Sequence, residues 1–147
     1  MQLSPNLTLH QATYSQSASR NKLDNTPNKA EIEELKKTAL ELFEPIKAQF
    51  PDVVLTSMFR SEKVNASIGG SKTSQHRLGQ AIDIDRPSLE KNKEMFLWIK
   101  DNLVFGQLIW EFGNSEGPDW VHVGRGTKKQ ILVAYRGKDG TTKYKKY

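Results

Sequence analysis

Two of the three histidines in this 147-residue chain lie in segments where they could bind a metal ion. His76 is in a polar loop, seven residues before Asp83, and His122 is in the later segment 120–124. Two imidazoles and one carboxylate are a common ligand set for catalytic zinc, with a fourth position left for water. The chain has no cysteine, so thiolate zinc sites and cysteine nucleophiles are excluded. The third histidine, His10, lies in a polar N-terminal arm, and we expect it to be structural or solvated.

Two predicted strands would present these groups on one side of a sheet. Alternate residues of a strand face the same side. In the segment 81–85, AIDID, the isoleucines take one face and Asp83 takes the other. In the segment 120–124, WVHVG, two valines take one face and His122 takes the other. If the two strands are neighbours, Asp83 and His122 can lie close together, and His76 could complete the set.

The rest of the pattern mixes helices with strands, which predicts an α+β fold with a small antiparallel sheet and flanking helices. Apolar residues spaced by three and four predict amphipathic helices at 28–50 and 88–103, with Asn28 and Ser88 as N-caps. Apolar runs predict further strands at 52–61, 105–112 and 130–137. The segments 105–112 and 120–124 are predicted to form a hairpin. The polar residues 1–28 are expected to be an ordered arm or a short helix rather than a packed element.

Length and composition suit one domain, which we expect to span 1–147. No apolar run is long enough to cross a membrane, and the N-terminus lacks the basic and apolar regions of a secretory signal. Charge is concentrated at the C-terminal end, since residues 125–147 carry eight Lys or Arg and one acid, for a net charge of +7. Such a segment favours an anionic partner. The alternative is a solvated, partly frayed tail that aids solubility.

A pattern of spaced residues extends from the predicted strand 52–61 to the second histidine. Its positions are Ser57, Arg60, Ser61, Asn65, Gly69, Gly70, Ser71, Ser74, His76, Gly79, Ala81, Asp83, Trp120 and His122. This pattern resembles that of the zinc D-Ala-D-Ala carboxypeptidase family, which includes phage endolysins and shares its fold with the hedgehog signalling domain. The resemblance is to its small single-domain members, and it covers the chain up to about Val123.

The resemblance implies a zinc peptidase acting on peptidoglycan stem peptides, with His76, Asp83 and His122 as the metal ligands. The general base is expected to be Asp119, because family members often have an acid three residues before the last histidine ligand. Strict alternation would turn Asp119 to the wrong face, so this role requires it to lie at the strand entry. Glu111 is the alternative base, because the hedgehog-like branch has an acid at the end of the partner strand.

Two further residues take roles from the resemblance. Arg60 is expected to bind a substrate carboxylate or to stabilise the oxyanion, tasks that suit a planar guanidinium. Ser74 is expected to hydrogen-bond the substrate or to orient the loop. Trp120 could form a wall of the site or simply pack, and packing is expected. The segment 125–147 has no counterpart in the family pattern, and we expect it to attract the anionic cell wall rather than to take part in the chemistry.

Two other functions remain open from the sequence. The chain could be a zinc-containing binding module of the same fold that does not hydrolyse, or a nucleic-acid-binding domain that uses its basic end. We expect the enzyme, a monomer with no stable nucleic-acid or membrane partner, cleaving either a D-Ala-D-Ala or an L-Ala-D-Glu bond. A phage enzyme of this kind would accumulate in the host cytoplasm before its release to the wall, or would be part of a virion.

Overall fold

A six-stranded sheet organises the computed structural model, which describes residues 1–147. In spatial order its strands are β3 (Val54–Ser57), β4 (Ala81–Asp85), β6 (Trp120–Gly124), β5 (Gln107–Glu111), β7 (Gln130–Arg136) and β8 (Thr142–Lys146). Neighbouring strands are antiparallel except β5 and β7, which run parallel. The α+β class and the predicted β5–β6 hairpin are confirmed.

The first long helical region is a composite of three segments. These are α3 (Lys29–Thr38), a π-helical turn (Ala39–Phe43) and α4 (Glu44–Gln49). Asn28 caps α3 as predicted, because its side chain accepts a hydrogen bond from the backbone N–H of Glu31. Pro45 lacks an N–H and its ring crowds the carbonyl four residues earlier. The wider π turn just before it accommodates that defect, so the helix continues to Gln49.

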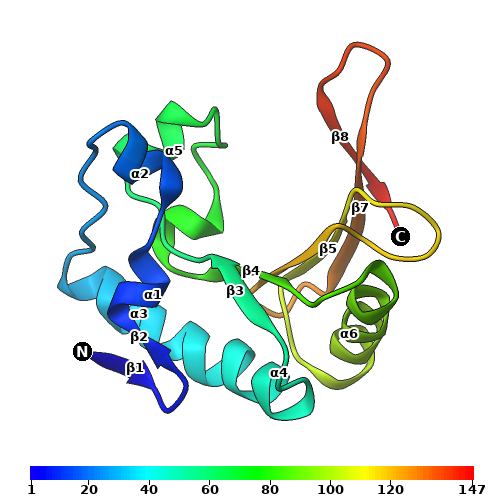
Figure 1. Cartoon of the computed structure of the whole chain (residues 1–147), viewed down its shortest axis with the longest axis horizontal. Coiled ribbons are helices and arrows are strands. Elements are labelled where there is room, and N and C mark those ends of the chain that lie inside the picture. Colours follow the sequence, from blue (N-terminus) through cyan, green and yellow to red (C-terminus); the bar gives the residue numbers. More distant parts are fainter.

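The second long helix, α6 (Leu89–Asn102), begins after Ser88, whose hydroxyl accepts from the backbone N–H of Lys91 as an N-cap should. Helices α3, α4 and α6 lie on the same side of the sheet (Figure 1). Their buried side chains, Leu42 and Phe96 among them, form one continuous core with the apolar faces of β4 and β6. The opposite face of the sheet is thereby left for polar groups. None of the helices has the length and apolar character needed to cross a membrane.

The N-terminal residues are packed more closely than the sequence suggests. They form a small hairpin and two short helices, β1 (Gln2–Ser4), β2 (Leu7–Thr8), α1 (Leu9–Thr13) and α2 (Gln16–Arg20). Leu3 and Leu7 are almost fully buried in the main core. The expectation of an unpacked arm was wrong, because these isolated leucines show no periodicity that marks a buried element.

Two short helical segments precede β4, namely α5 (Glu62–Ser67) and a 3₁₀ turn (Gln75–Leu78). A β-hairpin ends the chain. Strand β7 was predicted, and β8 was not. The two strands rise from the sheet as a projecting hairpin (Figure 1). The ring of Tyr147 packs 5.0 Å from that of Phe96, so the chain end is docked rather than frayed.

Candidate metal centre

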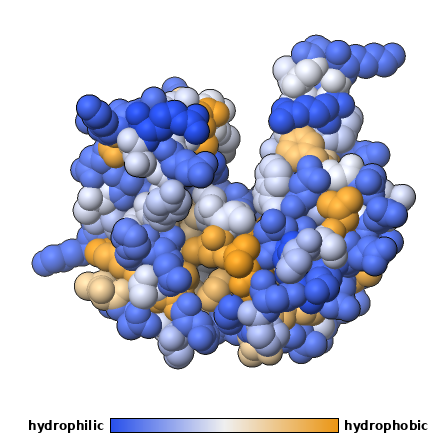
Figure 2. Space-filling view, viewed as in Figure 1, coloured by the Kyte–Doolittle hydropathy of each residue, from blue (hydrophilic) through white to orange (hydrophobic).

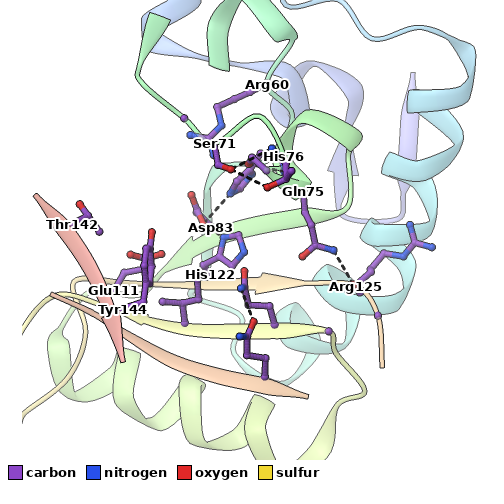
Figure 3. Close-up of a pocket in the computed structure, with 18 of the residues that line it drawn as sticks. Arg60, Ser71, Gln75, His76, Asp83, Glu111, His122, Arg125, Thr142 and Tyr144 are labelled. Atoms are coloured by element: carbon purple, nitrogen blue, oxygen red, sulfur yellow. Dashed lines mark hydrogen bonds and ion pairs between the residues drawn. The ribbon is translucent and has the colours of Figure 1, made fainter. Parts of the chain in front are cut away.

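Three potential ligands meet on the polar face of the sheet. Asp83 on β4 and His122 on β6 are direct cross-strand neighbours, as the alternation of both strands predicts. The 3₁₀ turn brings His76 to the same place, with only 2% of its surface exposed. One possible ligand atom from each residue lies within 4.8 Å of the others. Figure 3 shows the three side chains converging.

The spacing of these atoms fits a tetrahedral zinc ion. Oδ1 of Asp83 is 3.2 Å from Nε2 of His76 and 3.0 Å from Nδ1 of His122. Ligand atoms placed about 2.0–2.1 Å from a tetrahedral zinc ion are about 3.3 Å apart. Asp83 is therefore already at the separation from each histidine that zinc would impose, and all three ligand atoms lie within 4.8 Å of one another.

The orientation of His76 also suits a ligand. Its Nδ1 lies 2.7 Å from the carbonyl oxygen of Met58, which can only accept, so Nδ1 carries the proton. Nε2 consequently has a free lone pair directed at the cluster, and it is buried without a hydrogen-bond partner. Such an outer hydrogen bond fixes the tautomer of metal-binding histidines. Gly79 ends the 3₁₀ turn at φ 73°, a conformation that favours glycine, and so returns the chain to β4.

Asp83 is held in its ionised form. Burial alone would raise the pKa of this carboxyl, but the two adjacent imidazoles outweigh burial and hold the pKa well below its usual value. A carboxylate must be ionised to bind a metal ion. The electrostatics of the cluster therefore agree with its geometry.

Arg60 lies beside the cluster and is available to bind an anion. Its backbone N–H donates to the carbonyl of His76 at 3.1 Å, which ties the two segments together. Burial lowers the pKa of Arg60, while the nearby charges of Asp83 and Glu111 act to raise it. Its Nε is buried with no hydrogen-bond partner. The guanidinium therefore faces the site with unused donor capacity.

The two acids proposed as general base are separated by the structure. Glu111 is 8% exposed and lines the same pocket as the cluster. Burial, followed by the charge of Asp83, raises the pKa of Glu111 to about 7, against the opposing influence of His122 and Arg60. Asp119 is exposed and borders a different pocket. The structure thus does not bring Asp119 to the cluster, contrary to our expectation.

Strand register explains this correction. β6 begins at Trp120, which shares a face with His122, so the preceding residue is turned away. The backbone N–H of Asp119 donates to the carbonyl of Glu111 at 2.9 Å and continues the β5–β6 ladder. The regular alternation of strand side chains therefore already applies at Asp119. The expected role as general base required an irregular backbone at this residue.

A pocket of about 860 Å³ surrounds the cluster. Arg60 and Ser74 line it, which places these two sequence-predicted residues at the site, and Trp120 lines it too, although packing was expected for Trp120. In the space-filling view it opens as a hollow between the lobe that carries α5 and the C-terminal hairpin (Figure 2). The arrangement offers three potential metal ligands, a buried acid and a cation in one cleft.

Comparison with known protein families identifies the family of this chain. The sequence model of the family described as peptidase M15 matches residues 5–124. The chain belongs to the peptidase M15 family. The resemblance inferred from the motifs is thus confirmed, and M15 peptidases are zinc-dependent metallopeptidases. A search among curated proteins found no match to the chain.

Some residues at the site of this M15 peptidase were not anticipated. Thr142 and Tyr144 on β8 line the pocket, whereas no site residue was expected in the segment 125–147. Gln75 also lines it and donates to the backbone carbonyl of Arg125 at 2.9 Å. No local signal in the sequence marks Tyr144, because its position depends on how the last two strands are added to the sheet.

Proposed function

We propose that this M15 peptidase is a zinc enzyme that hydrolyses peptidoglycan stem peptides. One observation carries the proposal: the His76–Asp83–His122 cluster shares a single pocket with Glu111 and Arg60. A metal site alone would suit a binding module. A buried acid with a raised pKa and a cation with free donors, both beside the cluster, are the additional groups that peptide hydrolysis requires.

Each residue has a specific task in this proposal. Zinc held by His76, Asp83 and His122 would supply a Lewis acid that polarises the scissile carbonyl and acidifies water. Glu111 accepts a proton from the attacking water and passes it to the departing amine, tasks that suit a buried acid beside the cluster. Arg60 binds a substrate carboxylate or the developing oxyanion. The hydrogen bond between His76 and the carbonyl of Met58 keeps the imidazole in the correct tautomer.

The alternative of a non-catalytic zinc module is less well supported. It would leave Glu111 buried without a task, and burying an acid costs free energy. The nucleic-acid alternative depends on the basic C-terminal segment, yet that segment lines the pocket with Thr142 and Tyr144 rather than with cations alone. We therefore retain the peptidase as the proposed function.

The finer assignments are also proposals. The bond cleaved is D-Ala-D-Ala or L-Ala-D-Glu, the enzyme acts as a monomer, and it functions in cell-wall lysis or remodelling. In a phage it would act from the host cytoplasm after release to the wall, or from a virion. The lysines of the C-terminal hairpin would hold it near the anionic wall.

Digestion of purified peptidoglycan tests the proposal directly. The protein is loaded with one equivalent of zinc and incubated with sacculi and with synthetic stem peptides, and the products are identified by mass spectrometry. We expect cleavage that a chelator abolishes and that added zinc restores. The product masses distinguish the two candidate bonds. Zinc-loaded, folded protein that cleaves neither sacculi nor stem peptides would contradict the proposed function.

A further inference from the structure

The family match ends at residue 124, but the pocket extends beyond it. The β7–β8 hairpin contributes Gln130, Thr142 and Tyr144 to the pocket lining. Figure 3 shows Thr142 and Tyr144 on the side of the cluster away from Arg60 and Ser71. The cleft therefore has one wall made from the family-matched segment and a second wall made from residues outside it.

Strand register points the Tyr144 side chain into the cleft. Ala134 on β7 is paired with Glu111 on β5 on one side and with Tyr144 on β8 on the other. Directly paired residues share a face, so Glu111, Ala134 and Tyr144 form a row on the polar side of the sheet. Ala134, which lies between the phenol and the carboxyl group in this row, has only a methyl side chain and is fully buried.

The charges of the site reach Tyr144. Burial, and then the negative charges of Glu111 and Asp83, raise the pKa of its phenol. The side chain of Tyr144 is about half exposed and lines the pocket, so its hydroxyl, which can donate and accept, is accessible to a ligand in the cleft.

The distance from the cluster determines which part of a substrate Tyr144 can meet. β8 is three strands away from β6, so its backbone is about 14 Å from that of His122 at the usual strand spacing of about 4.8 Å. This separation exceeds one residue of extended peptide, which spans about 3.3 Å. Tyr144 can therefore contact a residue beyond those that form the scissile bond.

We propose that the β7–β8 hairpin is the second wall of the substrate cleft and that Tyr144 is a specificity-determining residue that contacts a peptide residue away from the scissile bond. The inference rests on the proposed peptidase function. The phenol hydroxyl donates a hydrogen bond to a carbonyl or carboxylate oxygen of the peptide, and the ring packs against its small side chains. The hairpin thereby selects substrates longer than a dipeptide.

The hairpin itself offers a matched control for the test. Tyr135 on β7 lies on the opposite face of the same hairpin, and it borders a different pocket with Lys145. Tyr144→Phe removes only the hydroxyl, Tyr144→Ala removes the whole side chain, and Tyr135→Ala makes the same truncation away from the cleft. Zinc stoichiometry and thermal denaturation show whether each variant is folded and loaded.

The experiment measures kcat and KM on a stem pentapeptide and on the dipeptide that contains only the scissile bond. For the pentapeptide, we expect Tyr144→Phe to raise KM by roughly threefold to tenfold, the effect of one lost hydrogen bond. Tyr144→Ala should raise it further. Neither variant should change the kinetics on the dipeptide, and Tyr135→Ala should match the wild type on both.

The possible negative results distinguish a failure of this inference from a failure of the proposed peptidase function. If the wild type cleaves the pentapeptide and both Tyr144 variants equal Tyr135→Ala, the inference is wrong and the peptidase function stands. Equal losses on pentapeptide and dipeptide, or loss of zinc in Tyr144→Phe, would mean that Tyr144 supports the site structurally, which also overturns the inference. If the zinc-loaded wild type cleaves neither peptide, the proposed function itself fails.

Discussion

Asp83 and His122 face each other directly across β4 and β6, with Oδ1 of Asp83 3.0 Å from Nδ1 of His122. The pair is fixed by backbone register, so its geometry does not depend on a flexible loop. The third potential ligand, His76, lies on a 3₁₀ turn. The hydrogen bond from its imidazole to the carbonyl of Met58 fixes the orientation of the ring. A metal site with two ligands on adjacent strands is well preorganised.

Removal of one ligand should abolish zinc binding. His122→Ala leaves two ligands, too few for a stable site, so we expect loss of stoichiometric zinc and of activity. Metal content is measured by mass spectrometry after dialysis. His10→Ala is the control, since His10 is exposed on α1 outside the cluster, and it should retain zinc. Full zinc occupancy in a double variant, His76→Ala with His122→Ala, would contradict the assignment.

The general base is expected to be Glu111. Glu111→Gln keeps the size of the side chain but cannot accept the proton, so kcat should fall by about 10²-fold or more while zinc remains bound. Asp119→Asn should have kcat close to the wild type, because Asp119 lies outside the pocket of the cluster. If Asp119→Asn is inactive and Glu111→Gln is active, the assignment has to be reversed.

The pKa of Glu111 predicts how stability depends on pH in the metal-free protein. Its pKa is about 7 in the folded chain and 4.5 ordinarily, so between these values the native state holds a proton that the unfolded chain has released. The free energy of unfolding should therefore fall as pH rises through this window. Glu111→Gln removes this loss, so relative to the wild type it should gain up to about 3 kcal/mol between pH 4 and pH 8.

Urea denaturation with a chelator present, repeated across this pH range, measures the difference. Glu116→Gln is a suitable control because Glu116 is an exposed acid of the β5–β6 loop. Its stability should follow that of the wild type at each pH. If the free energies of unfolding of the wild type and of Glu111→Gln change in parallel with pH, the pKa of Glu111 is not raised in the folded chain.

The task of Arg60 can be determined with a blocked substrate. Arg60→Ala should raise KM for a stem peptide with a free C-terminal carboxylate if its guanidinium binds that group. Amidation of the peptide should then raise KM for the wild type and leave the variant unaffected. If the variant instead loses kcat equally on both peptides, Arg60 stabilises the oxyanion.

The lysines of the hairpin should act at long range on the wall. Lys138, Lys143 and Lys145 are exposed, and none of them lines the pocket of the cluster. Changing all three to Gln should weaken binding to intact sacculi and flatten its salt dependence, because such attraction acts over about 8 Å in physiological salt. Turnover of a small soluble peptide should stay at the wild-type rate. A loss of that turnover in a folded, zinc-loaded variant would contradict the purely electrostatic role.

The metal cluster could be predicted because it depends on the simplest rule of strands. The period of two in AIDID and WVHVG assigns a face to Asp83 and to His122 without knowledge of the rest of the fold. The alternation of strand side chains could not decide between Asp119 and Glu111 as the general base. The face of Asp119 depends on the residue at which β6 begins, and one position of error turns a side chain to the opposite face.

The C-terminal wall was beyond prediction for a different reason. β8 has the sequence TKYKK, and all of its residues are exposed, so no apolar face marks it as a strand. The placement of Tyr144 also requires the parallel pairing of β5 with β7, a long-range contact that no local pattern specifies. The buried leucines of β1 and β2 were missed likewise, since each lies alone in a polar stretch.

β5 is an interior strand only because β7 pairs with it. A chain ending at Gly124 would leave β5 as a free edge next to the apolar side chains of Leu108 and Trp110, and its unpaired backbone groups would be open to a strand of another copy. In the whole chain the outermost strand on this side is β8, which carries Lys143, Lys145 and Lys146. A second copy approaching this edge meets like charges. The C-terminal hairpin therefore protects the protein against edge-to-edge aggregation.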